Sequence, residues 1–276
     1  MRKTLIAGIA AGALVAVAAA LPASAAEGDA QLSVLHAVPG VTVDVYVNGA
    51  LTLDDFTPGT LAGPLPLPAG TYSVAITASD AADASSPLIG PVDLALAANG
   101  NYTAVAHLDA AGKPTATLFT NDTATLAAGE GRLTVRHVAA APAVDVLAAG
   151  SPVITNLANP GESVLTLPAG TVSASVAATG TTDPVIGPAD VDVAEGTNTI
   201  VYAWGSLADG NLALAVQTIG GLHSNPGGVP AGTAGLVATN QPADPAGLLI
   251  GGALALLLSA LAITAVRSRM LAKVER

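Results

Sequence analysis

Hydrophobic and polar residues alternate with a period of two through much of the chain. Val43 and Val45 alternate with Asp44 and Tyr46, and residues 72–77 repeat the pattern. Such alternation predicts β-strands with one buried face. Pro-Gly, Asn-Gly and Pro-Ala-Gly turns separate these short runs, and no segment between the two long apolar runs at the chain ends shows a helical period. The pattern therefore predicts an all-β fold.

The same pattern occurs twice. LSVLH at 32–36 returns as LTVRH at 133–137, and LPAGT at 67–71 returns at 167–171. PLIGP at 87–91 returns as PVIGP at 184–188. The repeat predicts two tandem homologous domains, residues 26–122 and 123–219, each an antiparallel β-sandwich. Alanine and valine take the place of aromatic residues in the expected cores, so the two domains should depend partly on one another for stability.

Both ends of the chain have targeting patterns. Residues 1–25 combine a basic start, an apolar run and an A-x-A sequence before a cleavage point between Ala25 and Ala26, as in a secretory signal peptide. Residues 247–266 carry no charge and are followed by the basic tail 267–276, as in a single membrane-spanning helix with a cytoplasmic C-terminus. The alternatives are an uncleaved N-terminal anchor and a buried helix of a soluble domain.

Residues 220–246 are rich in Gly, Pro and Ala and have no hydrophobic period, which predicts a flexible stalk. A folded extension is the alternative. Leu236 and Thr239 lie where a cell-wall sorting motif would stand, but the Pro and final Gly of such a motif are missing. A permanent anchor and covalent transfer to the wall both stay open, with the anchor favoured.

Charge separates the ends from the body. The whole chain has 276 residues and a formal charge of −11, but residues 26–246 carry three basic against nineteen acidic side chains, a net charge of −16. Such a surface repels polyanions and excludes nucleic-acid binding. The chain contains no cysteine, which excludes disulfides, thiolate metal sites and a cysteine nucleophile.

The candidate site residues are two equivalent pairs, His36 with Asp44 and His137 with Asp145. A His–Asp pair can relay protons or bind a metal. In the strand pattern, however, His36 shares a face with apolar residues whereas Asp44 is on the opposite face. We therefore expect a structural histidine bonded to turn backbone, and an Asp44 side chain in solvent.

No other set of residues in the sequence predicts a catalytic, metal-binding or sugar-binding site. The closest acids are Asp54 with Asp55, Asp80 with Asp83, and Asp190 with Asp192, and none lies in a calcium-loop motif. No nucleophile elbow is present. Of the seven aromatic residues only Tyr46 has clear outward parity, which disfavours a sugar-binding platform. We expect no catalytic residue, no dedicated metal site and no cofactor.

Two segments of each copy resemble a known family. VLHAVP at 34–39 followed by VDVYVNG at 43–49, and the later LPAGTY at 67–72, resemble the DUF 4397 family, a domain of unknown function. The second copy keeps His137, Pro142 and LPAGT but has Leu147, Ala149 and Val172 where the first has Tyr, Asn and Tyr. The resemblance covers residues 31–119 and 133–218. It implies an exported bacterial envelope protein with immunoglobulin-like or transthyretin-like sandwiches, and no activity.

Together these patterns predict an exported, membrane-anchored cell-surface protein with a non-enzymatic structural or interaction role. The alternatives are an extracellular binding module for a small ligand, glycan or cation, and a substrate for attachment to the cell wall. Expected partners are the membrane and a cell-wall or envelope protein. The oligomeric state and the partner's identity are left open by the sequence.

Overall fold

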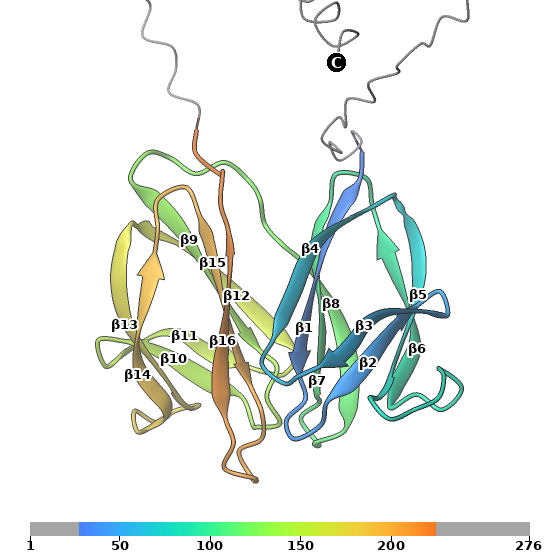
Figure 1. The fold of residues 1–276 in the computed structure, drawn as a ribbon. Coiled ribbons are helices and arrows are strands. Elements are labelled where there is room, and N and C mark those ends of the chain that lie inside the picture. The colour runs from blue at the N-terminus through green and yellow to red at the C-terminus, as the bar shows by residue number, and fades with distance from the viewer. Residues whose placement is uncertain (1–27, 225–276) are drawn as a thin grey trace, which may run out of the picture. The chain divides into compact units, whose positions relative to one another are not determined.

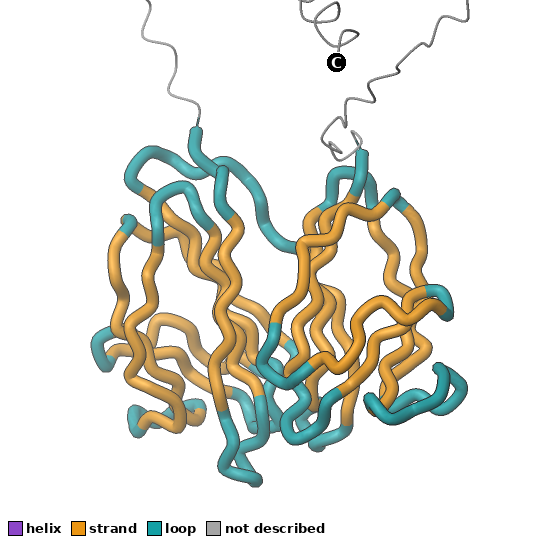
Figure 2. Tube along the Cα trace, in the orientation of Figure 1, coloured by secondary structure: helices purple, strands orange, loops and turns teal. Residues whose placement is uncertain are grey.

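The computed structural model describes residues 28–224, which belong to one compact unit. These residues form strands and loops and no helix (Figure 2). No helix in this range could therefore cross a membrane. The predicted signal peptide 1–25, membrane helix 247–266 and tail 267–276 lie outside the described residues, as do Ala25, Ala26, Leu236 and Thr239.

The first repeat contains eight strands in two four-stranded sheets (Figure 1). One sheet has the order β4-β1-β7-β8 and the other has the order β3-β2-β5-β6. The strands are β1 (Ala30–Ala37), β2 (Val43–Val47), β3 (Ala50–Phe56), β4 (Leu61–Leu67), β5 (Gly70–Ala78), β6 (Ile89–Leu96), β7 (Asn101–Leu108) and β8 (Pro114–Thr120).

The second repeat follows the same plan, with sheets β12-β9-β15-β16 and β11-β10-β13-β14. Its strands are β9 (Glu130–His137), β10 (Val144–Ala148), β11 (Ser151–Leu157), β12 (Gly161–Pro168), β13 (Gly170–Ala178), β14 (Pro184–Val193), β15 (Asn198–Trp204) and β16 (Ala213–Ile219). The all-β sandwich prediction is confirmed. The prediction of wholly antiparallel sheets is wrong, because β1 pairs with β7 and β9 pairs with β15 in parallel.

Valine and other small aliphatic residues fill the space between the two sheets of each repeat. In the second repeat this core includes Val135, Val146, Val176 and Val201. In the first it includes Val43, Val45 and Ile76, with a second group around Leu32 and Tyr102. In β2, β5 and β13 the inward positions Val43, Val45, Ile76 and Val176 are those that the alternation predicts. In β15 the residue in the sandwich core is Val201, whereas the alternation singles out the opposite face, Ile200 and Tyr202.

Two central strands, β7 of sheet β4-β1-β7-β8 and β9 of sheet β12-β9-β15-β16, are buried on both faces. The alternation did not predict this second buried face. Every residue of β7 after Asn101 and every residue of β9 after Glu130 is buried. The second face is covered by the other repeat: Leu35, Val105 and Phe119 of the first repeat form one apolar cluster with Ile200 and Tyr202 of the second. The two sandwiches therefore share a core, formed between sheet β4-β1-β7-β8 and sheet β12-β9-β15-β16.

The folded part extends into the segment predicted to be the stalk. Leu222 is buried, its amide donates to the Gly196 carbonyl (2.9 Å), and its carbonyl accepts from the Leu126 amide (2.7 Å). The Ser224 amide also donates to the Leu126 carbonyl (3.1 Å). Residues 220–224 thus belong to the sandwich body because Leu222 supplies a buried side chain, and residues 225–246 lie outside the described range.

Candidate functional site

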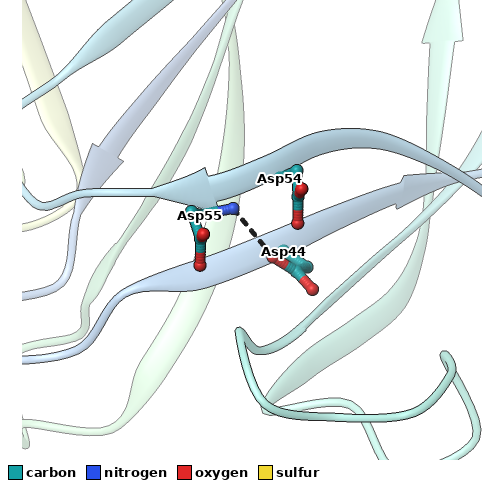
Figure 3. Close-up of side chains that lie close together, drawn as sticks. All are labelled: Asp44, Asp54 and Asp55. Atoms are coloured by element: carbon teal, nitrogen blue, oxygen red, sulfur yellow. Dashed lines mark hydrogen bonds between the residues drawn. The ribbon is translucent and has the colours of Figure 1, made fainter.

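Three carboxylates meet on the hairpin formed by β2 and β3 (Figure 3). One oxygen each of Asp44, Asp54 and Asp55 lies within 4.8 Å of the others. The hairpin brings them together because the register of β2 and β3 shifts between Val43 and Val45, and Asp55 adopts a positive φ of 51° there. The Asp55 amide then donates to Asp44 Oδ1 at 2.9 Å, as the dashed line in Figure 3 shows.

This arrangement corrects the expectation for Asp44, which is buried rather than solvated. A carboxylate that accepts a backbone N–H can be buried because the bond compensates its lost hydration. Tyr46, which follows on the same face of β2, is also buried instead of exposed. Of the other acidic pairs that the sequence singled out, Asp80, Asp83, Asp190 and Asp192 are exposed.

No basic residue of the described part neutralises the three carboxylates. The range 28–224 contains three basic residues: Arg132 pairs with Asp122 (3.1 Å), Arg136 pairs with Glu162 (2.9 Å), and Lys113 is in the β7–β8 turn, where its amide donates to Asp109 Oδ1. Like charges this close repel one another. A hard cation, which prefers carboxylate and hydroxyl oxygens, would relieve that repulsion.

A buried hydroxyl lies beside the acidic group. Thr77 is directly opposite Asp44 in the β2–β5 ladder, so the two side chains leave the same face of the sheet. Thr77 is fully buried, and its Oγ1 has no hydrogen-bond partner among the described residues. Thr77 therefore offers a further oxygen next to the carboxylates.

The second repeat shows which part of this arrangement the fold requires. Asp145, the counterpart of Asp44, accepts the Asn156 amide at 2.8 Å and the Gly180 amide at 2.9 Å. These bonds lower the pKa of Asp145 below the usual aspartate value. The residues opposite are Thr155 and Asn156 in place of Asp54 and Asp55, so the hairpin needs one buried aspartate but not the two exposed ones.

Both paired histidines are hydrogen-bonded to turn backbone. His36 Nε2 donates to the Val41 carbonyl (2.8 Å), and His137 Nε2 donates to the Pro142 carbonyl (3.0 Å). In each ring Nδ1 accepts, at 3.5 Å, from the amide two residues later. Burial lowers the pKa of both histidines from the ordinary value of 6.5, against the raising effect of the carbonyl bonds. Neither ring bonds to the aspartate proposed as its partner.

A third buried histidine, His107, was not predicted. Its Nδ1 donates to the Leu108 carbonyl (2.8 Å), so the neutral ring accepts the Thr117 hydroxyl at Nε2 (2.9 Å). Burial is the main cause of its lowered pKa, and the nearby His137 lowers it further. The comparison of the repeats could not single it out, because Trp204 is at its place in the second copy.

A polar network crosses the shared core between the repeats. Gln217 of the second repeat donates to Ser33 Oγ (3.2 Å) and accepts at Oε1 from the hydroxyls of Thr103 (3.0 Å) and Tyr202 (2.6 Å). The Arg136 guanidinium donates to the Tyr202 hydroxyl (2.8 Å). The network thus connects Ser33 and Thr103 of the first repeat to side chains of the second.

The same guanidinium also contacts the first repeat directly. Its Cζ lies 4.3 Å from the centre of the Phe119 ring. Arg132 is buried too, and its Nη1 donates to the carbonyls of Asp122 and Ala124 (both 3.1 Å) in the segment that joins the repeats. Two of the three basic residues in the range 28–224 lie on β9, and this concentration is a signal in the sequence that could have indicated the interface.

The two matches of one family model cover the sandwiches. The model described as "Domain of unknown function (DUF4397)" matches residues 30–147 and 138–227. The chain therefore belongs to the DUF4397 family, and the prediction of two tandem copies is confirmed. Among solved structures it is similar to the Bacillus anthracis TIE protein, at 18% identity and a TM-score of 0.19 over 64% of this chain and 33% of that one. The comparison with curated proteins gave no match.

Proposed function

We propose that the chain is an exported, membrane-anchored bacterial envelope protein whose two DUF4397 sandwiches form one non-enzymatic structural or interaction module. The observation that carries this proposal is the core shared by the two repeats, with its buried network from Ser33 to Arg136. Such a core supports a structural or presenting role, because it fixes the repeats to each other. A non-catalytic role is also favoured by the three buried histidines, whose ring nitrogens are all engaged in hydrogen bonds.

The proposed cellular location of the protein depends on residues outside the described range. The predicted leader 1–25 directs export, and the predicted span 247–266 with its basic tail retains the chain in the membrane with the sandwiches outside. Lys113 is the one exposed basic residue of the range 28–224. The two sandwiches would therefore present an acidic surface outside the membrane. A cell-wall or envelope protein is the proposed partner class.

The strand order also favours one of the two sandwich classes named above. In the immunoglobulin constant fold the first, second, fifth and fourth strands form one sheet. Here the first and second strands of each repeat belong to different sheets. This order disfavours the immunoglobulin-like alternative, so we propose the transthyretin-like class for the repeats.

Cell fractionation tests the proposed anchoring. The full chain is expressed in a Gram-positive host, and cell envelopes that still contain the wall are treated either with mild detergent or with a wall-digesting enzyme. We expect release by detergent and digestion of the sandwiches by protease added to intact protoplasts. Release by wall digestion alone would favour covalent attachment to the wall instead. Protection of the sandwiches from added protease would contradict export.

Cation binding by the first repeat is a second candidate function, supported by Asp44, Asp54, Asp55 and the unpartnered Thr77 hydroxyl. The oxygen ligands and the lack of a basic neighbour favour calcium, which binds six to eight oxygens and would complete its shell with water. Titration of the full chain with calcium should raise its melting temperature. The matched control is the double variant D54T/D55N, which carries the residues of the second repeat at these positions. An equal calcium effect in both proteins would exclude this site.

A further inference from the structure

An apolar cavity of about 320 Å³ opens between the two sheets of the second repeat. It lies where the edge strands β11 and β12 leave the sandwich open. Leu133, Leu165 and Leu167 line it from one sheet, and Val146, Ile154 and Val172 line it from the other. The lining exposes no polar surface to the cavity. Whatever enters it must therefore bury hydrocarbon, because an unpaired polar group there would lose its hydration.

The first repeat carries a larger, aromatic side chain at the corresponding position. Tyr72, the counterpart of Val172, packs against the core around Leu32 and Leu67. Its hydroxyl donates to the Pro68 carbonyl at 2.7 Å. Leu32 and Leu67 correspond to Leu133 and Leu167 in the lining of the cavity. In the first repeat, this part of the sandwich thus accommodates one aromatic ring with a para hydroxyl, the side chain of Tyr72.

The second repeat carries smaller side chains than the first at three positions around the cavity. Val172 replaces Tyr72, Ala174 replaces Val74, and Ala148 replaces Val47. All three smaller residues line the cavity, whereas most other lining residues are leucine, isoleucine or valine in both repeats. The cavity therefore coincides with three positions at which the second repeat carries the smaller side chain.

We propose that this cavity is a binding site for a small molecule with a single phenol-type aromatic ring. The ring takes the place of the missing Tyr72 ring. Its hydroxyl extends beyond the apolar lining toward the carbonyl of Pro168, the counterpart of Pro68, whose bond to Tyr72 in the first repeat is solvent-exposed. An aliphatic cavity of about 150 Å³ engineered in another protein stays dry and binds benzene, so the volume is sufficient for one ring. The proposal is independent of how the protein is anchored.

The two repeats supply matched variants for the test. The probe is p-cresol, which has the atoms of a tyrosine side chain, titrated into the full chain by calorimetry with 1-hexanol as the alkyl comparison. Wild type should bind one p-cresol per chain and show a concentration-dependent rise in melting temperature. V172Y should lose this binding, because it restores the ring that the first repeat carries. Y72V should bind two p-cresol molecules per chain, since it opens the first repeat as well.

Three results would overturn the proposal. The first is no binding of p-cresol to wild type at concentrations that leave the protein folded. The second is equal binding by wild type and V172Y, which would place the ligand elsewhere. The third is tighter binding of 1-hexanol than of p-cresol, which would assign the cavity to alkyl chains. If Y72V does not fold, A174V provides the second variant: it narrows the cavity without adding a ring and should weaken p-cresol binding.

Discussion

The hydroxyl of Tyr202 is the atom whose removal probes the shared core most cleanly. Tyr202 is fully buried, its hydroxyl accepts from Arg136 Nη1 at 2.8 Å, and it donates to Gln217 Oε1 at 2.6 Å. Y202F keeps the ring and creates no cavity, but it leaves a donor of a buried guanidinium and an amide oxygen with fewer partners. An unsatisfied buried polar group costs about 1–3 kcal/mol, and a charged one more. We therefore expect Y202F to lower the free energy of unfolding by about 2–4 kcal/mol.

Urea unfolding followed by far-UV circular dichroism measures this loss. Y72F is the control, because it deletes the same atom from a hydroxyl whose bond to the Pro68 carbonyl is solvent-exposed. Water replaces the lost partner there, so Y72F should cost less than about 1 kcal/mol. Equal free energies of unfolding for Y202F and Y72F would show that the Arg136–Tyr202–Gln217 network is not buried between the repeats.

Two further predictions concern titrating groups. The pKa values of His36, His107 and His137 are lowered by burial, so below about pH 6.5 the unfolded chain binds more protons than the folded one. The free energy of unfolding should be unaffected by these histidines above that pH and should fall as the pH is lowered, by at most about 1.4 kcal/mol per pH unit for each histidine. An unchanged urea midpoint between pH 7.5 and 5.5 would contradict this. D145A should cost about 2 kcal/mol in urea unfolding at pH 7, because the amides of Asn156 and Gly180 lose their acceptor; a loss no larger than that of D190A, at an exposed position, would refute it.

The period-two pattern predicted the strand structure and, for β2 and β5, which side chains face the core. It placed Val43, Val45 and Ile76 in the core, where the structure has them. It also placed His36 on the inner face, bonded to turn backbone. These features depend on residues close in sequence and on the side-chain alternation of a strand, which a single sequence records.

Contacts between the repeats could not be read from that pattern. The alternation does not indicate that Arg132 and Arg136 are buried, because charged side chains are seldom buried without partners, and their partners, Asp122 and Glu162, lie on other segments of the chain. Asp44 was placed in solvent for the same kind of reason: a strand pattern does not show that the β3 register shift turns the Asp55 amide toward it. The acidic group at the candidate site therefore appeared only once the hairpin register was known.

Scanning calorimetry of the full chain tests most directly whether the two sandwiches form one module. Because Leu35, Val105 and Phe119 share a core with Ile200 and Tyr202, neither repeat can unfold without exposing apolar surface of the other. We expect one transition, with a calorimetric enthalpy equal to the van't Hoff enthalpy. Two separate transitions, or a calorimetric enthalpy about twice the van't Hoff value, would contradict the shared core.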